Sequence, residues 1–150
     1  MQVKFTLSDL MLIKIAQCDR DIDRCFPVMY ELRPHLLHAE FVSRIKYQQQ
    51  QYNYQLAYLE NAGNITTVAG FRISESLAWG KYLYVDDLVT AASDRSQGYG
   101  DAMFDWLVEY AKSHQCEQLH LDSGVQRFAA HRFYLKQRME ISGHHFSIKL

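Results

Sequence analysis

The six residues from Arg95 to Gly100 could bind an anion. They read Arg-Ser-Gln-Gly-Tyr-Gly and stand between a strand-like segment, 82–90, and apolar residues at helical spacing over 103–111. Glycine lets an anion approach the free N–H groups at a helix start, where partial positive charge gathers. Arg95 adds a charge that can pair with phosphate. We therefore predict a phosphate- or pyrophosphate-binding turn formed by Arg95, Ser96, Gln97, Gly98, Tyr99 and Gly100.

Two carboxylates before that turn could act on a substrate. Asp86 and Asp87 are adjacent in the predicted strand 82–90, and adjacent side chains of a strand point to opposite faces of the sheet. A buried carboxylate is costly unless it is paired or used, so an ion pair and a contact with substrate both stay open. We expect Asp87 to pair with a basic residue such as an arginine of region 127–138.

Hydrophobic periodicity predicts the elements that position these residues. The first strand falls in 3–7 or, as we prefer, in 11–15. The remaining expected elements are helices at 19–32 and about 38–50, strands at 54–58 and 65–73 around a turn at 61–64, a strand at 82–90, a helix after the glycine turn, a strand at 118–121, a helix at 128–135 and a strand at 146–150. This order predicts an α/β domain, and we find no linker that divides residues 1–150.

Composition narrows the classes of function. The chain has 150 residues, 48% of them hydrophobic, and 16 basic against 17 acidic residues. Because the charges are balanced and spread evenly, we expect no nucleic-acid partner. No apolar run approaches the roughly 18 residues that span a bilayer, so we expect no membrane partner either. The three cysteines form no Cys-x-x-Cys pair, and the N-terminus is too polar for a signal peptide, which favours a cytoplasmic protein. No cluster of residues suggests a metal site.

The glycine turn resembles a known signature. Arg95–Gly100 matches the pattern Arg/Gln-x-x-Gly-x-Gly/Ala of the GNAT superfamily of N-acetyltransferases, and Ala130-x-x-Phe133-Tyr134 matches that superfamily's second helix and its tyrosine. The resemblance is close over 81–150. It implies a mixed, mostly antiparallel central sheet that is splayed between two central strands and flanked by helices, with acetyl-CoA in the split.

The same resemblance implies roles for individual residues. The backbone of Leu88, Val89 and Thr90 holds the pantetheine arm, and the turn Arg95–Gly100 holds the pyrophosphate. Tyr134 is the expected general acid for the departing thiolate, since a phenol with a pKa of about 10 can donate to a thiolate; its other reading is a core tyrosine. Asp86 is expected to bind or deprotonate the acceptor amine. Arg127 replaces an asparagine of the family and is expected to contact the cofactor.

These assignments lead to an expected activity. The chain is expected to be an acetyl-CoA-dependent N-acetyltransferase that acts on a primary amine, namely a small amine, a lysine or a polypeptide N-terminus. The first alternative is an acyl-CoA-binding regulatory module of the same fold without catalysis. The second is a CoA-independent interaction domain that uses the aromatic-rich stretch 47–58. The sequence is compatible with a homodimer, and it does not identify the acceptor.

Overall fold

The computed structural model describes residues 11–150, as strands and helices in the predicted order up to residue 136. These are β1 (Met11–Ile15), α1 (Asp19–Leu32), α2 (His38–Tyr52), β2 (Gln55–Asn61), β3 (Asn64–Ser76), β4 (Gly80–Thr90), α3 (Tyr99–Ser113), β5 (Gln118–Leu121) and α4 (Phe128–Lys136), with a short 3-10 helix at Ala92–Asp94. The preferred first strand at 11–15 is confirmed, and the alternative at 3–7 lies outside the described residues. Among the helices of residues 11–150, none is long and apolar enough to cross a membrane.

The strands form one mostly antiparallel sheet in the order β1-β2-β3-β4-β5. The pairs β1–β2, β2–β3 and β3–β4 are antiparallel. Strands β2 and β3 join through Ala62 and Gly63, whose φ angles are 50° and 84°. Two consecutive positive φ angles give a two-residue hairpin the twist of its strands, and the turn predicted at 61–64 is confirmed.

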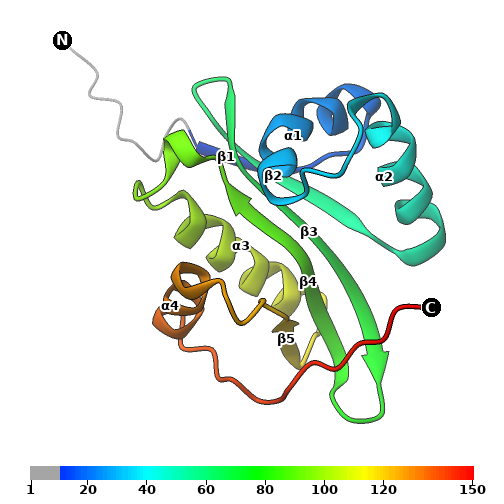
Figure 1. Cartoon of the computed structure of the whole chain (residues 1–150), viewed down its shortest axis with the longest axis vertical. Helices are drawn as coiled ribbons and strands as arrows, with labels where there is room; N and C mark the ends of the chain where they lie inside the picture. The colour runs from blue at the N-terminus through cyan, green and yellow to red at the C-terminus, as the bar shows by residue number, and fades with distance from the viewer. Residues whose placement is uncertain (1–10) are drawn as a thin grey trace. The chain divides into compact units, whose positions relative to one another are not determined.

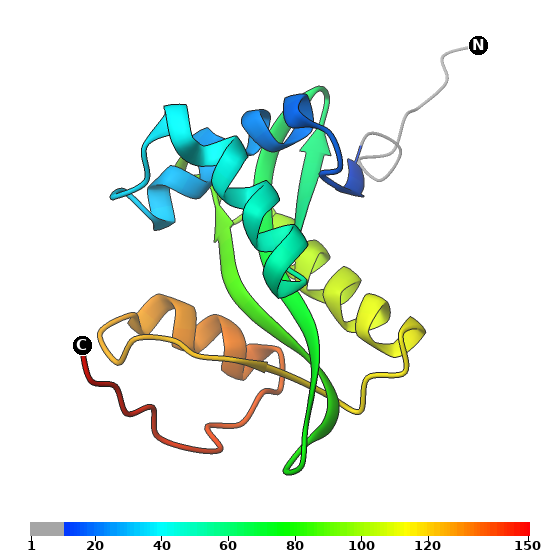
Figure 2. The same ribbon diagram turned by 90° about the vertical axis from the view of Figure 1, so that its right-hand side faces the viewer.

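Helices α1 and α2 cover one face of this sheet, and α3 covers the other (Figures 1 and 2). On the α1/α2 face the core includes Ile22, Met29, Phe41, Ile45, Leu56, Tyr58, Val68 and Val89. On the α3 face, Phe71 meets the rings of Trp106 and Tyr110 edge-on, with centroid separations of 6.0 and 5.1 Å. Edge-to-face packing is a favoured arrangement of aromatic pairs. The sheet is therefore buried on both sides where β3 and β4 pass between the helices.

The chain forms two compact units, one that ends at His120 and one that spans Leu121–Leu150. The second unit contains α4 and, from Leu121 on, no further strand. The strand predicted at 146–150 is therefore wrong. Phe146, Ile148 and Leu150 alternate as strand residues do, but their side chains are exposed and no neighbouring strand bonds their backbone. The single domain expected over 1–150 stays a prediction.

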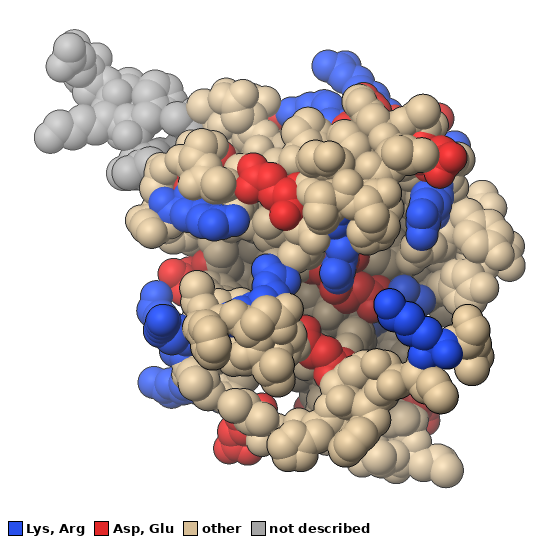
Figure 3. Space-filling model, in the orientation of Figure 1, with Lys and Arg blue, Asp and Glu red and all other residues tan. Residues whose placement is uncertain are grey.

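Lys and Arg side chains are interspersed with Asp and Glu over the face shown in Figure 3. No large area of one sign is visible there. The nearly equal numbers of basic and acidic residues in the sequence are thus also intermixed on this face.

The ladder between β3 and β4 contains a bulge at Asp86. Gly70 pairs with Asp87, and the next residue, Phe71, pairs with Val85, so Asp86 is the extra residue. An extra residue reverses the alternation of faces along the strand beyond it. Asp86 and Asp87 are therefore not forced onto opposite faces of the sheet.

Close to this bulge, Tyr54 lies against the backbone of β3 because Gly70 has no side chain. A Cβ atom placed on Gly70 would be 1.8 Å from the hydroxyl oxygen of Tyr54 and 2.7 Å from Oδ2 of Asp87. Tyr54 is 2% exposed, and its hydroxyl donates to Asp87 Oδ2 at 2.9 Å. Gly70 thus provides the space in which this buried hydrogen bond forms.

Replacing Gly70 by alanine should lower the free energy of unfolding by roughly 2–4 kcal/mol, since the added methyl group must displace Tyr54 and break its bond to Asp87. Urea unfolding followed by fluorescence measures the change. Gly143→Ala is the matched control, because a Cβ there meets no atom within 4 Å. Equal midpoints for the Gly70→Ala variant and the wild type would show that Tyr54 does not depend on this space.

Candidate functional site

A cavity of about 260 Å³ lies on the α1/α2 face. Its apolar lining comes from Met29, Leu36, Phe41 and Ile45, and its polar lining from Arg33, His35, Arg44, Gln48, Tyr54 and Asp87. Met29 and Phe41 are almost fully buried. A concave apolar surface with a few convergent polar groups is typical of a small-molecule site.

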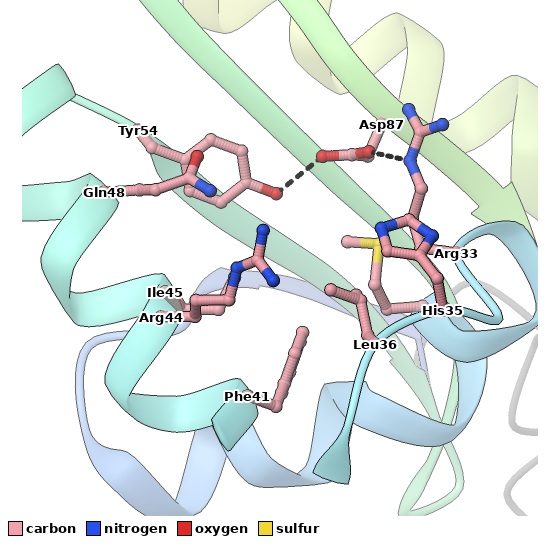
Figure 4. Close-up of a pocket in the computed structure, with 10 residues that line it drawn as sticks. Arg33, His35, Leu36, Phe41, Arg44, Ile45, Gln48, Tyr54 and Asp87 are labelled. Carbon is pink, nitrogen blue, oxygen red and sulfur yellow. Dashed lines mark hydrogen bonds and ion pairs between the residues drawn. The ribbon is translucent and has the colours of Figure 1, made fainter.

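Asp87 forms the polar end of this cavity (Figure 4). Arg33, at the end of α1, donates from Nε to Asp87 Oδ1 at 2.8 Å, while Tyr54 donates to the other carboxylate oxygen. Burial, and the negative charge of Asp87 beside it, raise the pKa of Tyr54 well above its ordinary value. Tyr54 therefore remains a hydrogen-bond donor. The predicted partner of Asp87 within 127–138 is wrong: the arginine comes from α1.

Asp86 is paired with a different arginine. Arg72 of β3 donates from Nε to Asp86 Oδ2 at 2.6 Å, and the same guanidinium carbon lies 5.8 Å from the ring centroid of Tyr54. Because Asp87 also contacts Tyr54, both carboxylates lie on the α1/α2 side of the sheet. The expectation that they face opposite sides is wrong, and the bulge at Asp86 is the reason. Burial raises the pKa of Asp86, although Arg72 lowers it.

The sequence analysis did not identify Arg33, Tyr54 or Arg72. A signal was present, because two adjacent carboxylates in a central strand require partners that neutralise them. In the sequence, Arg33 lies 54 residues from Asp87 and Arg72 lies 14 residues from Asp86. No local pattern distinguishes these two arginines from the other basic residues.

The predicted glycine turn precedes α3 as expected. Gly98 caps the helix with a φ of 85° and without a side-chain bond to the first turn. A Cβ atom on Gly98 would meet nothing within 4 Å, so the space beside this capping residue is open. Ser96 also has a positive φ, 62°. The turn therefore fits an anion at the helix N-terminus.

The side chains beside this turn have partners inside the first unit. Tyr99 is 5% exposed and its hydroxyl accepts a bond from Asn61 Nδ2 at 2.8 Å, so only its backbone is available at the turn. Arg95 lies 3.9 Å from Glu31 of α1. Arg95 is largely exposed, and such a pair is weak. The guanidinium can therefore turn toward a phosphate.

The last residues of β4 expose backbone groups at the outer edge of the strand. Ala91 N donates to Thr66 O of β3 at 2.8 Å. Because these groups alternate sides along a strand, Val89 also directs its N–H toward β3, whereas Leu88 and Thr90 direct theirs away. Of the three predicted pantetheine residues, Leu88 and Thr90 thus direct their N–H and C=O groups away from β3, and Thr90 O accepts a bond from Arg95 Nε at 3.4 Å.

Strand β5 does not cover that edge. Glu117 N donates to Lys81 O at 2.7 Å, so β5 starts beside the beginning of β4. Four strand residues span about 13 Å, whereas Leu88 lies about 23 Å along the strand from Lys81. The end of β4 therefore extends past β5, which agrees with the expected split in the sheet.

Tyr134 and Arg127 come together within the second unit. Tyr134 is half-buried in α4; burial raises its pKa and the charge of Arg127 lowers it. Arg127 is exposed and immediately precedes α4. The loop before it is held by His131, whose Nε2 lies 2.8 Å from Gly124 O. Within residues 11–150, no three His, Cys, Asp or Glu side chains are grouped as metal ligands.

Comparisons with known proteins agree with this geometry. The family model described as "Acetyltransferase (GNAT) family" matches residues 15–138. A protein named as an uncharacterized N-acetyltransferase of Bacillus subtilis (strain 168) is 35% identical over 109 residues, which are 73% of this chain and 77% of that protein.

Solved structures share the fold at low identity. A transcriptional regulator from Bacillus halodurans C-125 superimposes with a TM-score of 0.82 at 20% identity, over 93% of this chain and 99% of that one. The aminoglycoside N-acetyltransferase AAC(6')-Iy in complex with CoA superimposes with a TM-score of 0.81 at 10% identity, over 93% and 94% of the two chains.

The raised pKa of Asp86 predicts a pH dependence of stability. Because the folded protein holds this proton more tightly than the unfolded chain, the stability gained from Asp86 is full below the ordinary pKa of 3.8 and is lost as pH rises through the raised value. Over that window the wild type should lose free energy of unfolding relative to Asp86→Asn.

Urea titrations of both proteins at a series of pH values measure the difference. Asp105→Asn, at an exposed position of α3, is the control for removing one carboxylate. If the curves for wild type and Asp86→Asn stay parallel through the window, burial does not govern the titration of Asp86.

Proposed function

The chain belongs to the GNAT family of acetyltransferases, and we propose that this acyltransferase moves the acetyl group of acetyl-CoA to a primary amine by direct attack in a ternary complex. The observation that carries the proposal is the glycine-capped start of α3, which follows the end of β4 that extends past β5. A helix start that binds pyrophosphate and a strand edge that binds an amide-bearing arm together fit CoA.

In this proposal the first unit holds both substrates. Acetyl-CoA supplies the acetyl group as a thioester. The N–H groups at the start of α3 bind its pyrophosphate, and the backbone of Leu88 and Thr90 binds the pantetheine arm. The cavity on the α1/α2 face receives the acceptor, because it lies next to β4 and closes on Asp87. Holding two reactants in one orientation supplies much of the rate of such a transfer.

The proposed acid–base roles follow from the chemistry of the transfer. The amine nitrogen forms a bond to the carbonyl carbon, the carbon–sulfur bond breaks, and the amine loses a proton as the thiolate gains one. Tyr134 donates to the thiolate, since its raised pKa keeps it protonated at neutral pH. Asp86, with its raised pKa, accepts the amine proton through water. Arg127 contacts the cofactor.

An acetyl-acceptor screen tests the activity itself. The purified protein is incubated with acetyl-CoA and a panel of primary amines, lysine peptides and polypeptide N-termini, and release of free thiol is followed against a blank without acceptor. Acceptor-dependent release supports the proposal. CoA binding without release for any acceptor class would favour the non-catalytic binding module.

Gly100→Val should weaken acetyl-CoA binding at least tenfold, because the branched side chain blocks the approach of pyrophosphate to the helix start. Gly100 suits this test better than Gly98, since Gly98 has a φ of 85° and any side chain there strains the backbone. Valine is no poorer a helix former than glycine, so the variant should fold.

Calorimetric titration with acetyl-CoA measures the affinity, and circular dichroism checks the fold. Gly100→Ala should give a smaller loss. Wild-type affinity in a folded Gly100→Val variant would mean that the phosphate binds elsewhere.

Tyr134→Phe should reduce kcat by roughly 10- to 1,000-fold while acetyl-CoA affinity changes little, because one oxygen is removed and the ring is kept. Tyr47→Phe, at an exposed tyrosine of α2, is the matched control and should keep the wild-type rate. The measurement is steady-state kinetics with an acceptor from the screen. A Tyr134→Phe variant as fast as wild type up to alkaline pH would assign Tyr134 to packing alone.

A further inference from the structure

The cavity on the α1/α2 face holds more positive than negative charge. Its lining residues of the Asp, Glu, Lys and Arg types are Arg33, Arg44 and Asp87, which are two guanidinium groups against one carboxylate. Arg33 and Asp87 form an ion pair at 2.8 Å. The charge left for a ligand is therefore that of Arg44.

Arg44 differs from the other arginines around this site. Arg33 and Arg72 each pair with a carboxylate. No carboxylate of residues 11–150 lies within ion-pair distance of Arg44. Its guanidinium points into the cavity toward Tyr54 (Figure 4), above an apolar lining that includes the buried Phe41. Arg44 is exposed to solvent, so an anion that enters the cavity can reach its guanidinium, and the apolar lining beside it strengthens their attraction relative to bulk water.

A second donor lies on the same helix face. Gln48 follows Arg44 by one turn of α2, which places both side chains on one side of the helix, and both line the cavity. Gln48 accepts a bond from Arg72 at 3.4 Å through Oε1, which leaves its amide N–H₂ as a donor. Guanidinium and amide donors side by side suit the two oxygens of a carboxylate.

The two aspartates, in contrast, are poorly placed to attract a cation. Asp86 is paired with Arg72 and Asp87 with Arg33, so each carboxylate is already neutralised. A substrate that offered only a positive charge would meet a cavity of net positive sign. The charge of the lining therefore selects for an acceptor that carries a negative group.

We propose that the acceptor is a small primary amine that also bears a carboxylate, in the manner of an amino acid, and that Arg44 binds this carboxylate. The proposal rests on the proposed acetyl transfer and names its substrate class. The size of the site supports it, because about 260 Å³ is below the range of about 300–1,000 Å³ of drug-sized pockets. Arginine also recognises carboxylates in a bidentate geometry that lysine cannot reproduce.

Matched acceptor pairs test the proposal. Free α-, β- and γ-amino acids are compared with their primary amides, which keep the amine and the shape but lose the negative charge. In the wild type, kcat/KM for the preferred acid should exceed that for its amide by about 10- to 100-fold. Arg44→Gln should bring this ratio close to one, mainly through KM, and Arg44→Lys should retain part of it.

Lys46→Gln is the matched control, because Lys46 is a cation of the same helix that pairs with Asp19 at 2.8 Å and does not line the cavity. It should keep the wild-type ratio. Calorimetric titration of the preferred amino acid with CoA present gives a readout independent of turnover, and Arg44→Gln should weaken this binding by a similar factor.

Two results would overturn the proposal while acetyl transfer stands: amides accepted as well as acids by the wild type, or Arg44→Gln lowering kcat/KM equally for both members of a pair. If no amine in either panel is acetylated, the proposed function fails, and the substrate class fails with it. The two failures are therefore distinguishable.

Discussion

The hydrogen bond from Tyr54 to Asp87 is the interaction on which the cavity depends. A carboxylate in a central strand is costly to bury, and here a buried phenol and Arg33 occupy both of its oxygens. The phenol reaches the carboxylate only where β3 has a glycine, because any side chain at residue 70 would occupy the same space. One missing methyl group thus lets α1, the start of β2 and the middle of β4 meet at one point.

The bulge at Asp86 has a second effect on this site. Without it, the alternation of the strand would direct Asp86 toward α3, into the aromatic packing around Phe71. The extra residue brings both carboxylates to the α1/α2 side, where each meets its own arginine. Partly buried ion pairs such as these add little net stability because desolvation offsets much of their attraction. They instead fix the positions of the groups around the cavity.

Local features of the sequence predicted most of the fold. The period of apolar residues located α1, α2 and β5, and the two glycines after β4 located the start of α3, because these signals depend on neighbours within one or two turns. The partners of Asp86 and Asp87 could not be predicted, since Arg33 and Arg72 reach them only after the sheet forms. The strand predicted at 146–150 is wrong because alternating apolar residues form a strand only where a neighbouring strand pairs with them and one face is buried. Phe146 is instead exposed.

Glu31, at the end of α1, contacts the segment that leads into the glycine turn. Its Oε2 accepts a bond from Ala92 N at 2.8 Å and lies 3.9 Å from a terminal nitrogen of Arg95. A phosphate that binds Arg95 would therefore replace Glu31 as the anionic partner of this guanidinium, while Glu31 keeps its hydrogen bond to Ala92 N. Binding of a phosphate at the turn would then exchange one counter-ion of Arg95 for another, rather than neutralise an unpaired charge. The net gain from Arg95 is then the difference between its interactions with these two anionic partners.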